Sequence, residues 1–167
     1  MPVTTKTPLG AVTLNRKWRV DVNISATGAP TWVPLRGIGE FTPTTEYTTQ
    51  DTSDFDSEGF QSTTVTALGW GLEATVQRKT LAEDPEAYDA AQEALRLASE
   101  VMGLGNVVEI RYYEDNGPTG PKVQAYQGRV GVQWSEAGGD MTANSTATLT
   151  LSGQGRRVSI PHPALDD

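Results

Sequence analysis

The feature that most constrains the fold is a polar run at residues 41–60, made mostly of Thr, Ser, Asp and Glu. It separates two segments in which apolar and polar side chains alternate, a pattern typical of β-strands. The run has little to bury, and a polar loop of this length inside a small domain is usually functional or disordered. We therefore predict a long loop over 40–60 that becomes ordered against another copy of the same chain.

Length and composition indicate one globular domain. The chain has 167 residues, of which 37% are hydrophobic and 20% charged, which is ordinary for a protein with a buried core. It contains no cysteine, so disulfides, thiolate catalysis and cysteine zinc sites are excluded. We expect no secretory signal, because residues 1–8 have no apolar h-region and no cleavage pattern. We expect no membrane insertion, because no segment approaches the roughly 20 apolar residues of a membrane helix.

The charge excludes one class of function. The formal net charge is −8 and the pI is about 4.6. Binding to nucleic acid through phosphate neutralisation requires a basic stripe, which this composition does not favour. An acidic surface would instead repel nucleic acid.

The periodicity predicts a mainly β, α+β fold: an antiparallel sandwich or barrel flanked by one α-helix. We expect the helix at 85–102, because Asp84-Pro85 is a typical helix start and Gly103 a typical stop. An apolar stripe lies between them, formed by Tyr88, Ala91, Leu95, Ala98 and Met102. The domain is expected to span 16–155, with an N-terminal arm at 1–15 and a C-terminal arm at 156–167. The strands are expected at 18–24, 32–36, 62–78, 106–113, 122–134, 142–151 and 158–160.

No residue pattern predicts an enzyme or a cofactor. The only histidine, His162, lies between two prolines near the end, and we interpret it as a solvated tail residue. Asp51, Asp54, Asp56 and Glu58 superficially resemble a calcium loop, but position six of an EF-hand would be Asp56 instead of glycine. We therefore favour a solvated or subunit-contacting loop over a metal site.

The tryptophans and two strand glutamates allow two other interpretations. The four tryptophans could form a sugar-binding platform, but all except Trp32 lie on the apolar side of an alternating strand, which favours the core. Glu73 and Glu109 could be the paired carboxylates of a glycosidase. Surface or channel positions are far commoner for carboxylates on strands, so neither activity is the leading expectation.

Several segments together resemble the tail tube (major tail) proteins of long-tailed bacteriophages. They are the Trp18 strand, the run 51–60, the Asp84-Pro-Glu86 helix start and the closing strands 107–113, 125–130 and 147–153, with Gly138-Gly-Asp140 ahead of the last. The similarity covers roughly 15–160. It implies a β-sandwich flanked by one helix, whose subunits close into hexameric rings that stack into a tube for genome delivery.

The resemblance also implies partners and location. The protein would sit in the virion tail after synthesis in the host cytoplasm. Its partners would be itself and the tape measure, tail terminator and tail tip proteins, with DNA only in transit. A contractile or secretion-type tube remains open, and the alternative function is a non-catalytic β-sandwich module that binds a receptor or carbohydrate.

Two sets of residues are the candidates for these roles. The inter-subunit contacts are expected at Phe41, Tyr47, Asp51, Asp54, Phe55, Asp56, Glu58 and Phe60, because sparse aromatic residues in a polar segment often carry contact energy. The lumen is expected at Glu73, Thr75 and Gln77, which lie opposite an apolar strand face. Glu109 is a weaker lumen candidate because it shares a face with Arg111, and an ordinary outer surface is the alternative for both glutamates.

Overall fold

The computed structural model describes residues 7–163 of the chain. Its regular elements, in chain order, are β1 (Trp18–Asn23), β2 (Trp32–Pro34), β3 (Ile38–Asp51), β4 (Thr63–Gln77), α1 (Ala90–Ser99), β5 (Val107–Glu114), β6 (Ala125–Glu136) and β7 (Thr146–Ser159). Three short 3-10 turns accompany them: η1 (Asn15–Lys17), η2 (Phe55–Ser57) and η3 (Gly103–Asn106).

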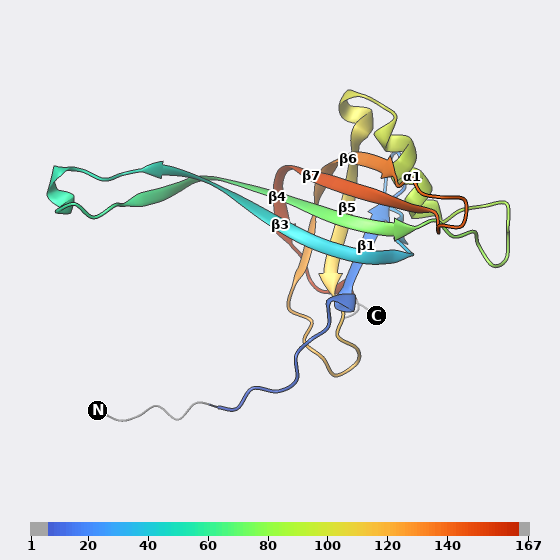
Figure 1. The fold of residues 1–167 in the computed structure, drawn as a ribbon, viewed down its shortest axis with the longest axis horizontal. Coiled ribbons are helices and arrows are strands. Elements are labelled where there is room, and N and C mark those ends of the chain that lie inside the picture. Colours follow the sequence, from blue (N-terminus) through green and yellow to red (C-terminus); the bar gives the residue numbers. More distant parts are fainter. Residues whose placement is uncertain (1–6, 164–167) are drawn as a thin grey trace.

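The strands form one antiparallel sheet of seven, in the order β2-β1-β5-β6-β7-β4-β3. Figure 1 shows β1 and β5 running across the direction of β3, β4 and β7, so that the sheet folds over into two layers. The outermost strands β2 and β3 are not paired with each other, and the sheet is open. The predicted mainly β fold with one helix is confirmed, and any closure into a ring must involve other copies.

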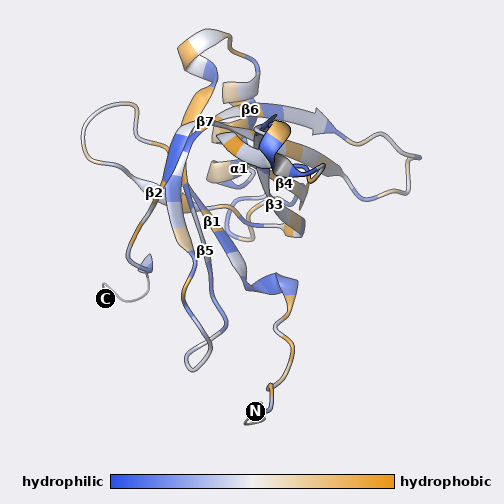
Figure 2. Ribbon diagram, turned by 90° about the vertical axis from the view of Figure 1, so that its left-hand side faces the viewer, coloured by the Kyte–Doolittle hydropathy of each residue, from blue (hydrophilic) through white to orange (hydrophobic). Residues whose placement is uncertain are grey.

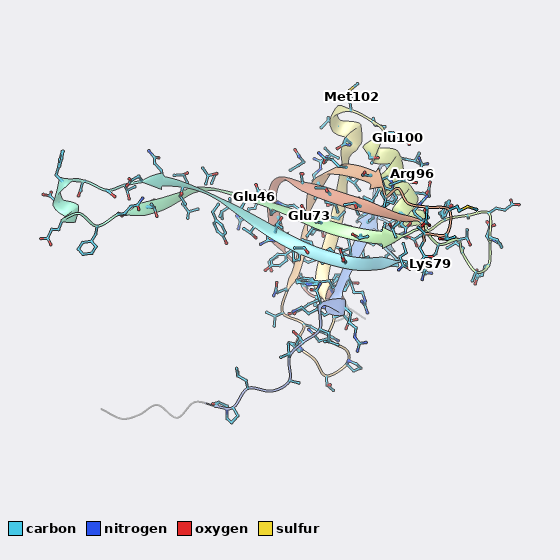
Figure 3. All side chains as sticks on the ribbon, viewed as in Figure 1. Glu46, Glu73, Lys79, Arg96, Glu100 and Met102 are labelled. Atoms are coloured by element: carbon cyan, nitrogen blue, oxygen red, sulfur yellow. The ribbon has the colours of Figure 1, made fainter. Side chains whose placement is uncertain are left out.

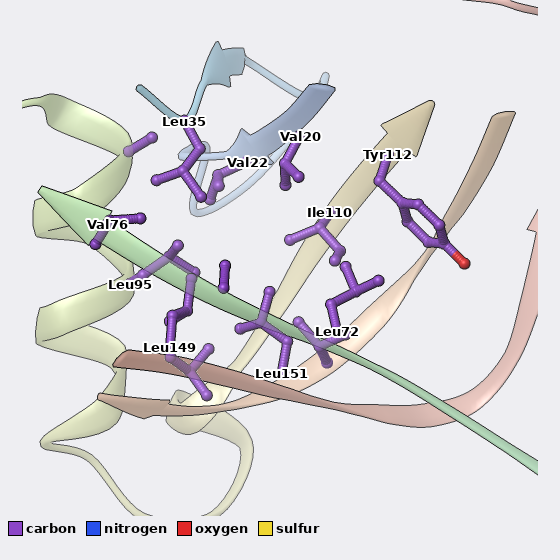
Figure 4. Packing of buried hydrophobic residues seen from close by; sticks show 14 of the residues in the cluster. Val20, Val22, Leu35, Leu72, Val76, Leu95, Ile110, Tyr112, Leu149 and Leu151 are labelled. Carbon is purple, nitrogen blue, oxygen red and sulfur yellow. The ribbon is translucent and has the colours of Figure 1, made fainter. Parts of the chain in front are cut away.

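The core fills the space between the two layers. The side chains of Val22, Val76, Ile110 and Leu149 are fully buried there (Figure 4). Helix α1 lies at the open side between the two layers, with β1 and β2 on one side and β3 and β4 on the other (Figure 2). It buries Leu95 completely. The alternating apolar positions of the strands therefore supply one continuous core.

The helix is shorter than predicted. It spans Ala90–Ser99 instead of 85–102, and its N-cap is Asp89, whose carboxylate accepts a hydrogen bond from the Gln92 N–H at 3.3 Å. Asp84 accepts one from the Glu86 N–H at 3.1 Å and so stabilises a preceding turn. Gly103 does adopt a left-handed conformation (φ 67°), but it begins η3 after the helix has ended.

The predicted loop over 40–60 is wrong. Residues up to Asp51 belong to β3, which pairs with β4 from Ile38↔Val76 to Asp51↔Thr63. Only residues 52–62 connect the two strands, and the resulting hairpin projects far from the body of the domain (Figure 1).

The predicted C-terminal arm and the domain end at 155 are also wrong in the described part. Strand β7 continues through Gly153–Arg157 to Ser159, and the Ile160 N–H donates to the Ala125 carbonyl at 3.0 Å. His162 is 3% exposed and lies 2.6 Å from the Glu114 carbonyl oxygen, so it is a packed residue and not a solvated tail residue.

The remaining part of that predicted arm, 164–167, lies outside the described residues, as do residues 1–6 of the predicted N-terminal arm. Residues 7–14 extend away from the body and are exposed (Figure 1).

Candidate assembly surfaces

The outer half of the β3–β4 hairpin is exposed on both faces. β-branched threonines at positions 44, 45, 48 and 49 favour the extended backbone, and pairing with β4 satisfies the backbone hydrogen bonds on one side of β3. Beyond Gly69, every described residue of the hairpin up to the tip is exposed. A two-stranded ribbon of this kind has no core of its own.

The acidic residues of the tip shape its turn. The Ser53 N–H donates to the Asp51 carboxylate at 2.8 Å, and the Asp56 N–H donates to Asp54 at 3.1 Å. Hydrogen bonds from Ser53 hold the pKa of Asp51 below its ordinary value. Glu58 and Gly59 both have positive φ angles, 51° and 83°, which turn the chain back toward β4. The carboxylates are therefore presented from a defined turn.

The tip also exposes two large aromatic side chains. Phe55 and Phe60 are 108% and 79% exposed. Closer to the body, Tyr47 and Leu68 pair across the two strands on the face that continues the core, and are 65% and 68% exposed. Exposed apolar residues gathered on one projecting element are typical of a protein–protein contact.

The structure separates the predicted contact residues into two groups. Tyr47, Asp51, Asp54, Phe55, Asp56, Glu58 and Phe60 all lie on the exposed part of the hairpin. Phe41 does not, because it lies in the body of the domain, at the other end of β3. It is 5% exposed and packs its ring 5.6 Å from Trp18 and 6.4 Å from Tyr112.

Sequence reasoning missed Val65 and Leu68. Leu68 alternates with Trp70 in the pattern of core residues, and Val65 follows beyond a register shift opposite Thr49. Both are exposed, because the hairpin extends beyond the body of the domain. A groove of about 880 Å³ lies at this junction, where the hairpin leaves the body beside Arg156 and Arg157.

The predicted lumen residues lie on a polar wall. Glu73 of β4 pairs with Thr42 of β3 and Thr150 of β7, and residues paired in this way point to the same face. The complete wall consists of Glu40, Thr42, Thr44 and Glu46 of β3, Gly71, Glu73, Thr75 and Gln77 of β4, Thr146, Thr148, Thr150 and Ser152 of β7, and Gly131, Gln133 and Ser135 of β6.

This wall contains three carboxylates and no Lys or Arg. Glu46 and Glu73 extend from the hairpin strands into solvent (Figure 3). The nearest cation along β6 is Arg129. It pairs with Gln154 of β7 on the same face, in the row next to the last pair of the wall, Gly131 and Ser152. Glu109 lies in the other layer, where its carboxylate accepts hydrogen bonds from Asn23 at 3.0 Å and Gln127 at 2.8 Å.

The wall has a free edge on each side. β3 is the last strand of the sheet, and β6 pairs with β5 only as far as Gly131. The Asn106 side chain bonds both the N–H and the carbonyl of Val132, at 2.9 Å each, which ends the pairing at that point. Unpaired strand edges are templates for pairing with another chain.

Residues 7–163 show neither a metal-binding cluster nor a membrane-spanning helix. Within that range, no group of three or more His, Cys, Asp or Glu side chains could hold a metal ion. The helix described there is too short and too polar to cross a membrane.

Comparison with known proteins identifies the fold. No protein-family model and no curated protein sequence matches the chain. A chain in the tail of an empty gene transfer agent particle with C6 symmetry matches with a TM-score of 0.67 at 12% identity, over 90% of this chain and 100% of that chain.

Two further solved structures share the fold. The SPP1 tail tube matches with a TM-score of 0.63 at 12% identity, over 93% of this chain and 84% of that chain. A chain from an extracellular contractile injection system, in its PVC sheath/tube terminator, matches with a TM-score of 0.55 at 10% identity, over 95% of this chain and all of that chain. The chain therefore has the fold found in these tail and tube assemblies.

Proposed function

We propose that this chain is a structural virion protein whose copies form stacked hexameric rings, and that the stack is the tube of a phage-type tail. The observation that carries the proposal is the β3–β4 hairpin, which projects exposed aromatic residues from a fold shared with tail and tube chains. An element with this much exposed apolar surface and no core of its own is stabilised by contact with a neighbour.

The polar wall is suited to line the channel. Neighbouring copies would extend the wall by pairing through the free edge of β3 and the unpaired end of β6, which removes both edges. Glu40, Glu46 and Glu73 would then face the passing genome with no cation of the wall between them. Phosphates are repelled by such a surface, so DNA slides through without adhering.

The proposed partners follow from this role. Tape measure, tail terminator and tail tip proteins would contact the tube, and DNA would meet it only in transit. The protein would be made in the host cytoplasm and reside in the virion tail. This role requires no cofactor and no catalysis.

The test is to shorten the hairpin while keeping the domain. Replacing residues 49–66 with Asn-Gly joins the paired positions Thr48 and Ala67 through a two-residue turn. The variant should retain the circular dichroism spectrum and cooperative melting of the parent but remain monomeric. Negative-stain microscopy and sedimentation at high concentration should show tubes for the parent alone. Normal tubes from the shortened variant would overturn the role of the hairpin, and a parent that stays monodisperse and binds glycans would favour the binding-module alternative.

A further inference from the structure

A basic groove lies at the opposite end of β3 from the hairpin tip. It has a volume of about 520 Å³ and opens between η1, β1 and the first residues of β3. Its lining includes three large apolar side chains and three arginines, namely Trp18, Leu35, Phe41, Arg16, Arg19 and Arg36. The apolar members are buried or half-buried, and the arginines are exposed.

The arginines are only weakly neutralised by their own chain. The Nε atom of Arg19 is 3.9 Å from the Asp115 carboxylate, and that of Arg36 is 4.0 Å from Asp89. Both guanidinium-bearing side chains are more than half exposed, at 52% and 72%, and surface pairs at such distances contribute little. Arg16 has no ion pair within the described residues. In a chain of net charge −8, three cations around one groove form a distinct positive patch.

The hairpin tip carries the opposite charge to the groove and exposes aromatic side chains that could enter it. Asp51, Asp54, Asp56 and Glu58 lie on the same tip as the exposed rings of Phe55 and Phe60, of which Phe55 is 108% exposed. The tip thus combines exposed aromatic side chains with carboxylates, and the groove combines aromatic side chains with guanidinium groups. Such a match of charge sets the register and the rate of association, while the buried aromatic residue supplies affinity.

The two surfaces cannot meet within one chain. A β-strand rises about 3.3 Å per residue, so Phe41 in the groove and Asp51 at the base of the tip are about 33 Å apart along β3. Figure 1 shows the tip and the start of β3 at opposite ends of the molecule. A contact between unlike ends of identical chains is head-to-tail, and it propagates from copy to copy as a ring or a helical stack.

We propose that the hairpin tip of each subunit docks into the groove lined by Arg16, Arg19 and Arg36 on a subunit of the adjacent ring. Phe55 enters over Trp18 and Phe41, and the tip carboxylates face the guanidinium groups. This inference rests on the proposed tube assembly and adds to it the surface that receives the hairpin.

Charge reversal on each side provides the test. A tip variant, Asp56→Lys with Glu58→Lys, and a groove variant, Arg16→Glu with Arg36→Glu, each place like charges opposite one another. Each alone should raise the protein concentration required for tube formation by about tenfold or more. In an equimolar mixture, the basic tip of the first variant meets the acidic groove of the second, and the acidic tip of the second meets the basic groove of the first. The mixture should therefore form tubes near the concentration at which the parent does.

A matched control changes the same charge elsewhere. Glu83→Lys with Glu86→Lys alters two exposed residues before α1 by the same amount as the tip variant and should assemble like the parent. Unchanged melting curves would show that each variant is folded. A groove variant that assembles normally, or a mixture that remains as deficient as its components, would overturn the docking inference. Those results would leave the tube proposal standing, because that proposal fails only if the parent forms no tubes.

Discussion

The indole ring of Trp70 lies directly against the backbone of Gly153, so that a methyl group at position 153 would be 2.5 Å from the Trp70 Nε1 atom. Gly128 borders the same ring, and the Nε1–H donates to the Gly155 carbonyl at 2.8 Å. The ring thus fixes the root of the hairpin on β4 to the region where β6 and β7 have an irregular register.

Gly153→Ala should therefore destabilise the domain. The methyl group collides with a ring that cannot move without losing its hydrogen bond, and overpacking of this kind costs about 1–3 kcal/mol. Gly138→Ala is the matched control, because nothing lies within 4 Å of a methyl group there. Urea unfolding of both variants checks the difference, and equal midpoints would contradict this packing.

Gln92 connects α1 to the sheet. Its side-chain amide donates to the Arg36 carbonyl at 2.8 Å and the Gln77 carbonyl at 3.1 Å, and accepts from Arg78 at 3.1 Å. Gln92→Leu keeps the volume but removes the donor from the Arg36 and Gln77 carbonyls, while Arg78 keeps its ion pair with Glu93. The variant should lower the free energy of unfolding by about 2–3 kcal/mol. Glu100→Gln, at the exposed end of the helix, should cost less than about 0.5 kcal/mol. Similar urea midpoints for the two variants would argue against the role of Gln92.

Glu114 should make stability depend on pH. Burial alone would raise the pKa of this carboxyl, but hydrogen bonds from the Val123 N–H, the Lys17 ammonium and the Gln124 N–H lower it below the ordinary value. A carboxyl with a lowered pKa in the folded state stabilises the protein above its unfolded pKa. That stabilisation is lost as the pH falls from the ordinary carboxyl value through the folded one.

Glu114→Gln should therefore reduce the free energy of unfolding at neutral pH by about 1–3 kcal/mol and flatten its decline between about pH 5 and pH 3. Thermal melts of parent and variant across this range provide the measurement. Parallel curves for the two proteins would show that another group causes the acid sensitivity.

Glu73→Lys tests the channel wall. If Glu73 faces the lumen, the variant should still build tubes but slow genome ejection, because a cation on the wall binds phosphates. The effect should be largest at low ionic strength, since salt screens it. Glu83→Lys, outside the wall, should leave ejection unchanged. Identical ejection kinetics for parent and Glu73→Lys tails across a salt series would place Glu73 away from the lumen.

The elements that the sequence predicted correctly are those with a pattern of apolar residues within the element itself. Alternation located the core-forming strands, and the spacing of Ala91, Leu95 and Ala98 located the helix, because each pattern records which side chains are buried. The helix start was misplaced because Asp84-Pro85 has the chemistry of a cap but serves a turn, and Asp89 provides the real cap.

The errors fall where distant residues decide the structure. Strand β3 is exposed on both faces along its outer half, so it lacks the alternation by which strands are predicted, and its order comes from pairing with β4. The C-terminal segment is held by Glu114 and Tyr113, about 50 residues earlier in the chain. Among the predicted contact residues, the aromatic side chains of Tyr47, Phe55 and Phe60 are exposed on the hairpin, whereas Phe41 is buried against Trp18 and Tyr112.

Electron cryo-microscopy of the purified protein at high concentration tests the central claim most directly. The account predicts stacked six-fold rings in which the wall carrying Glu73, Thr75 and Gln77 faces the channel and each hairpin reaches a neighbouring subunit. A protein that stays monomeric under all assembly conditions, or a tube whose channel is lined by the β1–β5 layer, would contradict it.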